Sequence, residues 1–408
     1  MSGIVSRHFF PYNNFEIGSS KKTSAKTGAV HITVVSCLGL LFFRSAQMLN
    51  SFRKLTRSFL AATNTLAAAR SARDYVKKAA NRSKDYDSRV KSEIATFAND
   101  HSVHDLPGIF HYWSNKFLVP KIQPFGFIHP DDFFVKQLVN VINRIPASTY
   151  RFISVGAGNC DAEVRIAQNL CALGYENFVI ECFDLNEKML QRGLLLAQIN
   201  GCSSQILPVK GDFNHWNPRK TYHAVIANQS LHHVLNLEKL FDSIYSSIAS
   251  TSGALIISDM IGRNGHQRWP EALSIVEEIW KTLPERYKFN HQLKRVENSF
   301  VNWDCSTDGF EGIRAQDILP LLVQRFHFEL FVPFANIISP FIDRSFGHNF
   351  NVNDETDRLL IDSIHARDEE EMIRGNIKPT QMFAVLCTCA CETKHPKDFS
   401  PVQSIRHP

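Results

Sequence analysis

Two glycines one residue apart stand where a short apolar run meets a helix-like segment. Residues 152–155 are typical of a buried strand, and residues 162–173 have the apolar spacing of a helix. A strand that turns directly into a helix leaves backbone N–H groups free, and Gly156 and Gly158 let a ligand come close to them. Such a turn is where an open α/β sheet binds an adenosine-containing ligand.

Later strand-like runs also end in polar side chains. Asp184 follows the second run, 26 residues after Gly158, which suits a carboxylate that accepts both hydroxyls of a ribose. Asp212 and Phe213 follow the third run and offer a carboxylate and a ring face to an adenine. The carboxyl ends of parallel strands meet at one edge of a sheet, so these loops are expected to form one site. The predicted cofactor-binding residues are Gly156, Gly158, Asn159, Asp184, Leu185, Asp212, Phe213, Asn228 and Gln229.

The residue at position 161 separates two classes of cofactor. A dinucleotide fingerprint Gly-x-Gly-x-x-Gly would need glycine there, but the chain has Asp161. A carboxylate facing a pyrophosphate is unfavourable. Asp161 therefore weighs against NAD or FAD.

Strand and helix patterns alternate around these loops. Alternation of this kind predicts an α/β fold, with a parallel sheet that has helices on both faces. Residues 262–312 read as irregular, and the acidic run at 368–371 reads as a solvated helix face. Expected strands are 151–155, 178–183, 205–209, 224–227, 254–258, 327–332 and 381–387; expected helices are 131–145, 162–173, 187–200, 237–250 and 354–364.

Together these residues resemble the class I S-adenosylmethionine-dependent methyltransferases, from about Leu106 to Leu386. The resemblance is to a bacterial-type subgroup that acts on small molecules. It implies a Rossmann-like sheet of seven strands, mainly parallel, in which residues 381–387 or their partner strand run antiparallel. It also implies that Gly156 and Gly158 pass under the methionine moiety and that Asn228 and Gln229 lie beside the sulfonium. The blocks that carry it are Gly-Ala-Gly-Asn-Cys-Asp (156–161), Asn-Gln-Ser-Leu-His-His (228–233), Arg-Asn-Gly-His-Gln-Arg-Trp-Pro-Glu (263–271) and Gly-Phe-Glu-Gly-Ile-Arg (309–314).

Two positions depart from this pattern. Many relatives have an acidic residue where Ser154 stands, and its loss removes one hydrogen bond that orients the amine of the cofactor. Many also have a third glycine where Cys160 stands, so the turn is expected to avoid a positive φ at that residue.

The adjacent histidines His232 and His233 are the predicted catalytic residues. Methyl transfer from a sulfonium is an in-line displacement, and a hydroxyl acceptor benefits from a base. Neighbouring helical residues point about 100° apart, so at most one of the two faces the acceptor, and His232 is preferred. The alternative is that both help to cap or pack the start of a helix.

The loop after the fifth strand is predicted to bind the acceptor. Arg263, His266 and Trp269 are the predicted substrate-binding residues, suited to an anionic or polyhydroxylated molecule. Farther along the chain, Glu311 is interpreted with Arg314 and Asp317 as a structural ion-pair cluster.

The charge distribution divides the chain into parts. Residues 1–100 have a net charge of +10, and residues 101–408 have −5. The sequence predicts a basic, partly helical extension (1–100), a methyltransferase domain (101–392) and a polar tail (393–408). An acidic domain without an Asn-Pro-Pro-aromatic motif disfavours nucleic acid as a substrate.

The cysteines and the apolar runs indicate a cytosolic-type compartment. Nine cysteines, most of them in apolar runs, read as reduced core thiols. Cys387, Cys389 and Cys391 read as part of a strand, and no metal site is predicted. The apolar run 29–43 is shorter than the ~20 residues of a membrane span. The basic amphipathic segment 45–97 either packs on the domain or contacts a membrane surface.

The sequence thus predicts a methyltransferase that uses S-adenosylmethionine and acts on a small-molecule or glycan-type acceptor at oxygen. One alternative is a methyltransferase-like scaffold that binds partners without catalysis. Another is a lipid or membrane-surface methyltransferase, motivated by the basic N-terminal segment. The oligomeric state and the identity of the acceptor do not follow from the residues.

Overall fold

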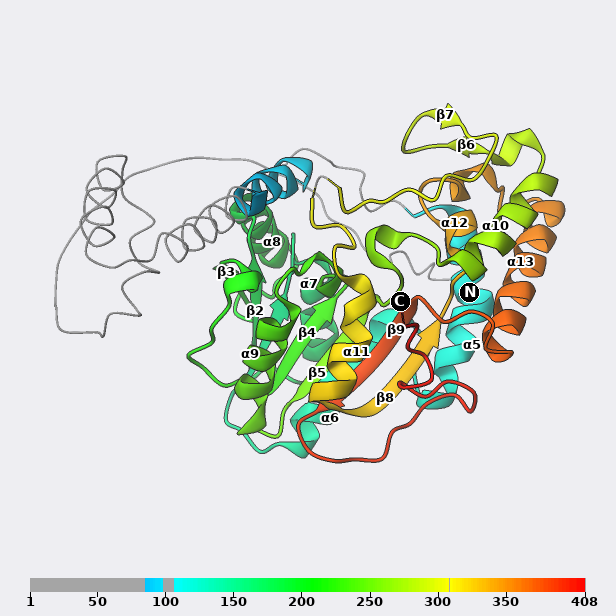
Figure 1. Ribbon diagram of the computed structural model, residues 1–408. Coiled ribbons are helices and arrows are strands. Elements are labelled where there is room, and N and C mark those ends of the chain that lie inside the picture. Colours follow the sequence, from blue (N-terminus) through cyan, green and yellow to red (C-terminus); the bar gives the residue numbers. More distant parts are fainter. Residues whose placement is uncertain (1–84, 98–105, 308, 408) are drawn as a thin grey trace, which may run out of the picture. The chain divides into compact units, whose positions relative to one another are not determined.

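The computed structural model describes residues 85–97, 106–307 and 309–407. The chain divides into two compact units, and the unit that contains residues 90–407 carries a central seven-stranded sheet, in the order β3-β2-β1-β4-β5-β9-β8 (Figure 1). β9 pairs antiparallel with both β5 and β8, and the remaining neighbours pair parallel. The predicted mainly parallel sheet, with its exception at residues 381–387, is confirmed. The strands are β1 Tyr150–Val155, β2 Phe178–Asp184, β3 Ile206–Lys210, β4 Ala224–Asn228, β5 Ala254–Met260, β8 His327–Phe334 and β9 Gln381–Cys387.

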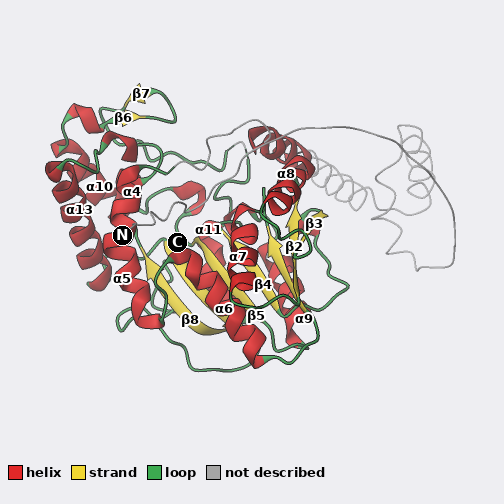
Figure 2. Ribbon diagram, turned by 180° about the vertical axis from the view of Figure 1, so that it is seen from behind, coloured by secondary structure: helices red, strands yellow, loops and turns green. Residues whose placement is uncertain are grey.

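Helices cover both faces of this sheet (Figure 2). Successive strand residues point to opposite faces, so Phe152 packs in one apolar core while Ile153 and Val155 pack in another. The core around Phe152 contains residues of α6 (Pro130–Arg144), α7 (Asp161–Ala172) and α8 (Glu187–Ile199). The core around Ile153 contains residues of α9 (Leu237–Ala249) and α11 (Ala315–Arg325). Strands buried on both faces explain why the sequences of β4 and of the first half of β5 are runs of apolar residues.

A further group of helices gathers beyond β8 in Figure 1, and part of it corrects the sequence analysis. Residues 262–312 were expected to be irregular, but they contain α10 (Pro270–Thr282) and a small hairpin, β6 (Phe289–Asn290) and β7 (Arg295–Val296). α10 begins with Pro270 at its first turn and buries Ala272, Val276 and Trp280 at four-residue spacing. The other helices of the group are α4 (Gly108–Trp113), α5 (Val119–Ile122), α12 (Ser339–Ile342) and α13 (Glu355–Ile373).

Helix α13 is also longer than predicted. It continues nine residues past Ile364, through the acidic run that was expected to face solvent. Asp368 is fully buried, and its carboxylate accepts hydrogen bonds from the backbone N–H groups of Asn336 (3.0 Å) and Ile337 (2.8 Å). The prediction of a solvated face is therefore wrong at Asp368, because a loop from another part of the chain needs its carboxylate.

The two ends of the chain are described to different extents. Residues 85–97 are helical, and the rest of the predicted segment 45–97 and the apolar run 29–43 lie outside the described residues. Within the described part, no helix is both long and apolar enough to span a bilayer. The C-terminal segment packs on the domain, since Phe399 is buried and Lys394 O accepts a hydrogen bond from Phe331 N.

Candidate active site

The turn between β1 and α7 has the open backbone that the sequence predicts. Gly156 and Gly158 have φ values of +73° and +54°, which L-residues with side chains rarely adopt. A Cβ atom on Gly156 would lie 2.6 Å from the Cβ of Ser230, so the turn also packs closely on the loop after β4. Cys160 has a φ of +61°, which corrects the expectation that this residue avoids a positive φ. The left-handed cap before α7 is kept although the third glycine is missing.

Helix α8 packs against this turn. A Cβ on Gly193 would lie 2.6 Å from Cys160 Sγ and 2.7 Å from Asn159 O, so only glycine leaves room for the buried thiol. Arg192 is buried beside it and donates from Nε to Asn159 Oδ1 at 2.9 Å. The side chain of Asn159 therefore points to α8, and its backbone is the part that borders the turn.

Asp184 links the ends of β1 and β2. Its Oδ2 accepts a hydrogen bond from Gly158 N (2.8 Å), and its Oδ1 accepts one from Asn186 N (2.7 Å). A carboxylate has about four lone-pair positions, so two remain for a pair of ligand hydroxyls. Burial raises the pKa of Asp184 from its ordinary value, and the two N–H donors oppose that rise. Leu185 is half-buried next to it.

A carboxylate from α7 stands beside Ser154. Glu163 is 2% exposed, and Ser154 Oγ donates to its Oε1 at 2.6 Å. Burial raises the pKa of Glu163, and the hydrogen bond from Ser154 lowers it in part. The strand thus lacks the acid that many relatives have at this position, but the neighbouring helix supplies one.

The loops after β3 and β4 hold the next predicted residues. Asp212 caps a short 3₁₀ turn by accepting from Asn214 N (2.9 Å), and Phe213 is half-buried against the sheet. Asn228 ends β4, and Gln229 has a φ of +52° while its N–H donates to Ser258 O at 2.7 Å.

Three polar atoms around these loops are buried and unused. Asn228 Oδ1, Asn186 Nδ2 and Ser230 Oγ have no hydrogen-bond partner among the described residues. An unpaired buried polar atom is costly, roughly 1–3 kcal/mol. Because all three follow the carboxyl ends of β2 and β4, they fit a polar ligand at this edge of the sheet.

A buried carboxylate at the end of β5 holds the predicted catalytic histidine. His232 is 2% exposed, Asp259 is fully buried, and His232 Nδ1 lies 2.6 Å from Asp259 Oδ1. Asp259 Oδ2 accepts from the N–H groups of Ser230 (2.8 Å) and Leu231 (2.7 Å), so the same side chain fixes the turn. Burial would lower the pKa of His232, but Asp259 and Glu311 outweigh it and raise the pKa to about 10.

Two glutamates complete a histidine cluster. Glu311 lies between three imidazoles: its Oε1 is 2.5 Å from His266 Nε2 and 3.4 Å from His232 Nε2, and its Oε2 is 3.4 Å from His233 Nε2. Glu93 Oε1, from the helix at 85–97, lies 2.8 Å from His233 Nδ1.

The histidines and glutamates shift each other's titration. Burial lowers the pKa of His266. In His233 the negative charges of Glu311 and Glu93 outweigh burial and raise the pKa. In Glu311 the three histidines outweigh burial and hold the pKa well below its ordinary value.

The predicted substrate-binding residues separate into two places. His266 joins the histidine cluster, where its ring centroid is 5.3 Å from that of His232. Arg263 instead stacks on Trp269 at 5.4 Å, and Arg406 covers the same ring at 4.6 Å.

The predicted ion-pair cluster around Glu311 forms only in part. Arg314 pairs with Asp317 (2.7 Å) and with Glu238 (2.7 Å). Glu311 lies with the histidines instead. Asp259, Glu311 and Glu93 are thus the site residues that sequence reasoning missed. Only Asp259, an acid that interrupts the apolar end of a strand, gave a local signal.

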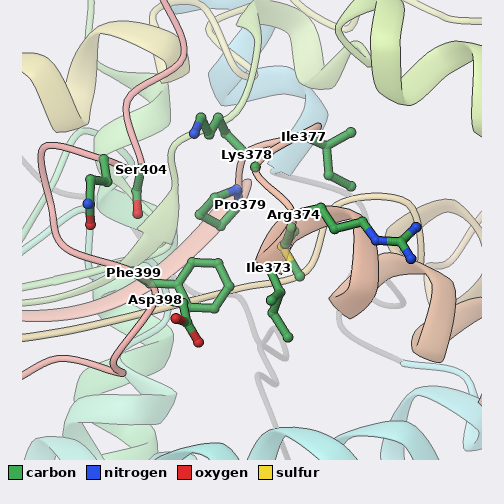
Figure 3. A pocket seen from close by; sticks show the side chains of 11 residues that line it. Ile373, Arg374, Ile377, Lys378, Pro379, Asp398, Phe399 and Ser404 are labelled. Carbon is green, nitrogen blue, oxygen red and sulfur yellow. The ribbon is translucent and has the colours of Figure 1, made fainter.

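A cavity of about 190 Å³ lies elsewhere, between the end of α13 and the C-terminal segment (Figure 3). Lys378, Asp398 and Ser404 line it together with the ring of Phe399. None of the predicted site residues lines this cavity.

Comparisons with known proteins give structural matches alone. No protein-family model matches the chain, and no curated protein sequence does. An O-methyltransferase from a polyketide synthase of Brevibacillus brevis, in complex with S-adenosyl-L-homocysteine, matches with 12% identity, 62% of this chain, 72% of that chain and a TM-score of 0.35.

Two other solved structures match at a similar level. A putative sarcosine dimethylglycine methyltransferase from Galdieria sulphuraria has 11% identity over 63% of this chain and 84% of its own, with a TM-score of 0.36. A geranyl diphosphate methyltransferase with its substrate and sinefungin has 9% identity over 64% and 77%, with a TM-score of 0.35. The sheet order and strand directions described above remain the firmer basis for the fold.

Proposed function

We propose that this protein is an S-adenosylmethionine-dependent methyltransferase that modifies a small-molecule or glycan-type acceptor at oxygen. The observation that carries the proposal is the set of loops after β1, β2, β3 and β4. The four strands that precede these loops all end at one edge of the sheet. Asp184, in the second loop, connects to the first loop through the hydrogen bond that it accepts from Gly158 N. Ligands of open α/β sheets bind at this edge, where the strand order reverses between β1 and β4.

Each part of the cofactor has a matching group in the chain. Asp184 would accept the ribose hydroxyls with its two remaining lone pairs, and Asp212 with Phe213 would hold the adenine. The unpaired Asn228 Oδ1 would accept from the methionine amine beside Gly156 and Gly158. The bound cofactor would supply an electrophilic methyl group on sulfur.

The histidine cluster favours a hydroxyl acceptor. A hydroxyl must lose its proton as it is methylated, and a neutral imidazole is a group that accepts such a proton. Because the pKa of His232 is raised to about 10, this histidine would act as a base only above neutral pH, where it is deprotonated. His266 extends the same cluster toward the loop after β5, which supports an acceptor site there. Arg263 and Trp269, stacked on each other, would form a separate wall of that site.

Calorimetric titration of the full chain with S-adenosylmethionine tests the proposal. We expect one site per chain, and we expect Asp184→Asn to weaken binding by about 10- to 100-fold, the value of a charged hydrogen-bond acceptor. Asp242→Asn, an exposed acid on α9 paired with Arg325, is the matched control and should bind like the parent. Absence of binding, or equal binding by Asp184→Asn and the parent, would contradict the proposal and favour a scaffold without cofactor.

A further inference from the structure

The histidine cluster has the arrangement of ligands around a metal ion. His232, His233 and Glu311 each offer one ligand atom, and these atoms all lie within 4.8 Å of one another. They come from two separate segments: the turn after β4, and the loop that precedes α11. The local sequence gave no sign of it, because none of the three stands at a recognisable metal-ligand spacing.

Both histidines have a carboxylate beside the far nitrogen of the ring. Asp259 lies 2.6 Å from His232 Nδ1 in a hydrogen bond, and Glu93 lies 2.8 Å from His233 Nδ1 as an ion-pair contact without hydrogen-bond geometry. The hydrogen bond to Asp259 places the proton of His232 on Nδ1 and turns its Nε2 lone pair outward, as in carboxylate–histidine–metal arrangements. Here the two Nε2 atoms converge on the same glutamate.

The separations fit ligand atoms around an ion better than they fit hydrogen bonds. His232 Nε2 lies 3.4 Å from Glu311 Oε1, and His233 Nε2 lies 3.4 Å from Glu311 Oε2. Both separations are longer than the roughly 2.7–3.2 Å of an N–H···O bond, whereas His266 Nε2, at 2.5 Å from Oε1, lies within hydrogen-bonding distance. Two atoms bound at ~2.1 Å to one ion with tetrahedral geometry are about 3.4 Å apart.

The charges of the cluster also favour a cation. When a cation takes the place of the protons on the two Nε2 atoms, the carboxylates of Asp259, Glu93 and Glu311 surround it with three negative charges. His232 and Asp259 are almost fully buried, where unbalanced charge is costly. The Glu311 side chain is 37% exposed, which leaves a side from which an ion and a further ligand could enter.

We propose that His232, His233 and Glu311 bind a divalent transition-metal ion, with Asp259 and Glu93 as the groups that orient the two histidines. Two imidazoles and one carboxylate suit Zn²⁺ better than Mg²⁺, which prefers oxygen ligands. The role of the ion rests on the proposed function: an ion bound here would hold the acceptor through an oxygen atom of the acceptor. His232 and His233 would then promote loss of the acceptor proton as ligands of the ion rather than as bases.

Metal titration of the full chain, stripped with a chelator and free of added cofactor, tests the site. We expect one Zn²⁺ per chain by calorimetry, and Co²⁺ in its place should give the intense visible absorption of a tetrahedral ion. Glu311→Gln, nearly identical in shape and half-exposed, should weaken binding by about 100-fold or more, and so should His233→Ala. His327→Ala, an exposed histidine at the start of β8, is the control and should bind like the parent.

The outcomes separate the metal site from the proposed function. Lack of stoichiometric Zn²⁺ binding by the parent, or equal binding by parent and Glu311→Gln, would overturn the metal site. The Co²⁺ spectrum of the parent decides the matter without any variant, should a variant fail to fold. S-adenosylmethionine is titrated into the same stripped protein, so cofactor binding without metal binding overturns the metal site alone. Metal binding without cofactor binding overturns only the proposed function.

Discussion

Replacement of Asp259 by asparagine is the sharpest test of how the site is held. The buried carboxylate has four donors: Ser230 N and Leu231 N on Oδ2, and His232 Nδ1 and Met260 N on Oδ1. An asparagine keeps one oxygen and turns an NH₂ group toward two donors. Two hydrogen bonds to a charged group are therefore lost, at about 1.5–3 kcal/mol each. We expect Asp259→Asn to lower the free energy of unfolding by about 3–6 kcal/mol, a large part of the usual 5–15 kcal/mol.

Urea denaturation of the full chain at neutral pH, followed by circular dichroism, measures this loss. Asp242→Asn is the matched control, because Asp242 is 68% exposed and its pair with Arg325 should contribute less than about 1 kcal/mol. A cost below about 1 kcal/mol for Asp259→Asn would refute the reasoning. It would mean that the turn after β4 is held by packing rather than by this carboxylate.

Three further substitutions test other contacts of the site. Gly193→Ala should weaken S-adenosylmethionine binding about tenfold or more in calorimetry, because the Cβ of the alanine would lie 2.6 Å from Cys160 Sγ. Leu195→Ala, at an exposed position of the same helix, is the control and should bind S-adenosylmethionine like the parent. Burial raises the pKa of Asp161 from 3.8 to about 8, so the free energy of unfolding of the cofactor-free protein should fall as pH rises between these values, by at most roughly 6 kcal/mol. Asp161→Asn should remove this pH dependence in urea titrations. Ser154→Asp should lower the free energy of unfolding by about 2–3 kcal/mol, because it places a second carboxylate beside the buried Glu163. Adding Glu163→Gln to this variant should restore most of the lost stability, and an equal loss in the single and double variants would contradict the contact between positions 154 and 163.

The sheet was predictable from local sequence patterns, and each error in the predicted elements has an identifiable cause. The run Ala254–Ile257 at the start of β5 is apolar because both faces of the strand are covered, and that pattern can be recognised without knowledge of the neighbouring strands. Helix α10 was missed, although its buried residues recur four apart, because the segments on either side of it are irregular and contain several glycines and asparagines. Asp368 was misjudged because the loop that uses its carboxylate, at Asn336 and Ile337, lies about thirty residues away.

The proposed cofactor side of the site follows from the sequence more directly than the proposed acceptor side. Gly156, Asp184 and Asn228 follow directly from the ends of strands, so their positions come with the sheet. The sequence analysis treated Ser154 and Cys160 as departures from the family pattern, but in the structure a residue of another segment compensates for each. Glu163 brings a carboxylate to Ser154, and Gly193 leaves room for the Cys160 thiol. A compensating residue on a neighbouring helix cannot be recognised from the sequence at position 154 or 160 alone.

The acceptor side depends on residues that only the folded chain brings together. Glu311 lies 78 residues after His233, and Glu93 lies 140 residues before it. Charge alone assigned Glu93 to the basic extension 1–100, yet its carboxylate lies 2.8 Å from His233 Nδ1. A truncation at residue 100 would therefore remove a partner of the histidine pair together with the basic segment. Any loss of activity in that truncation has two causes, and Glu93→Gln in the full chain separates the histidine contact from a role of the basic segment at a membrane.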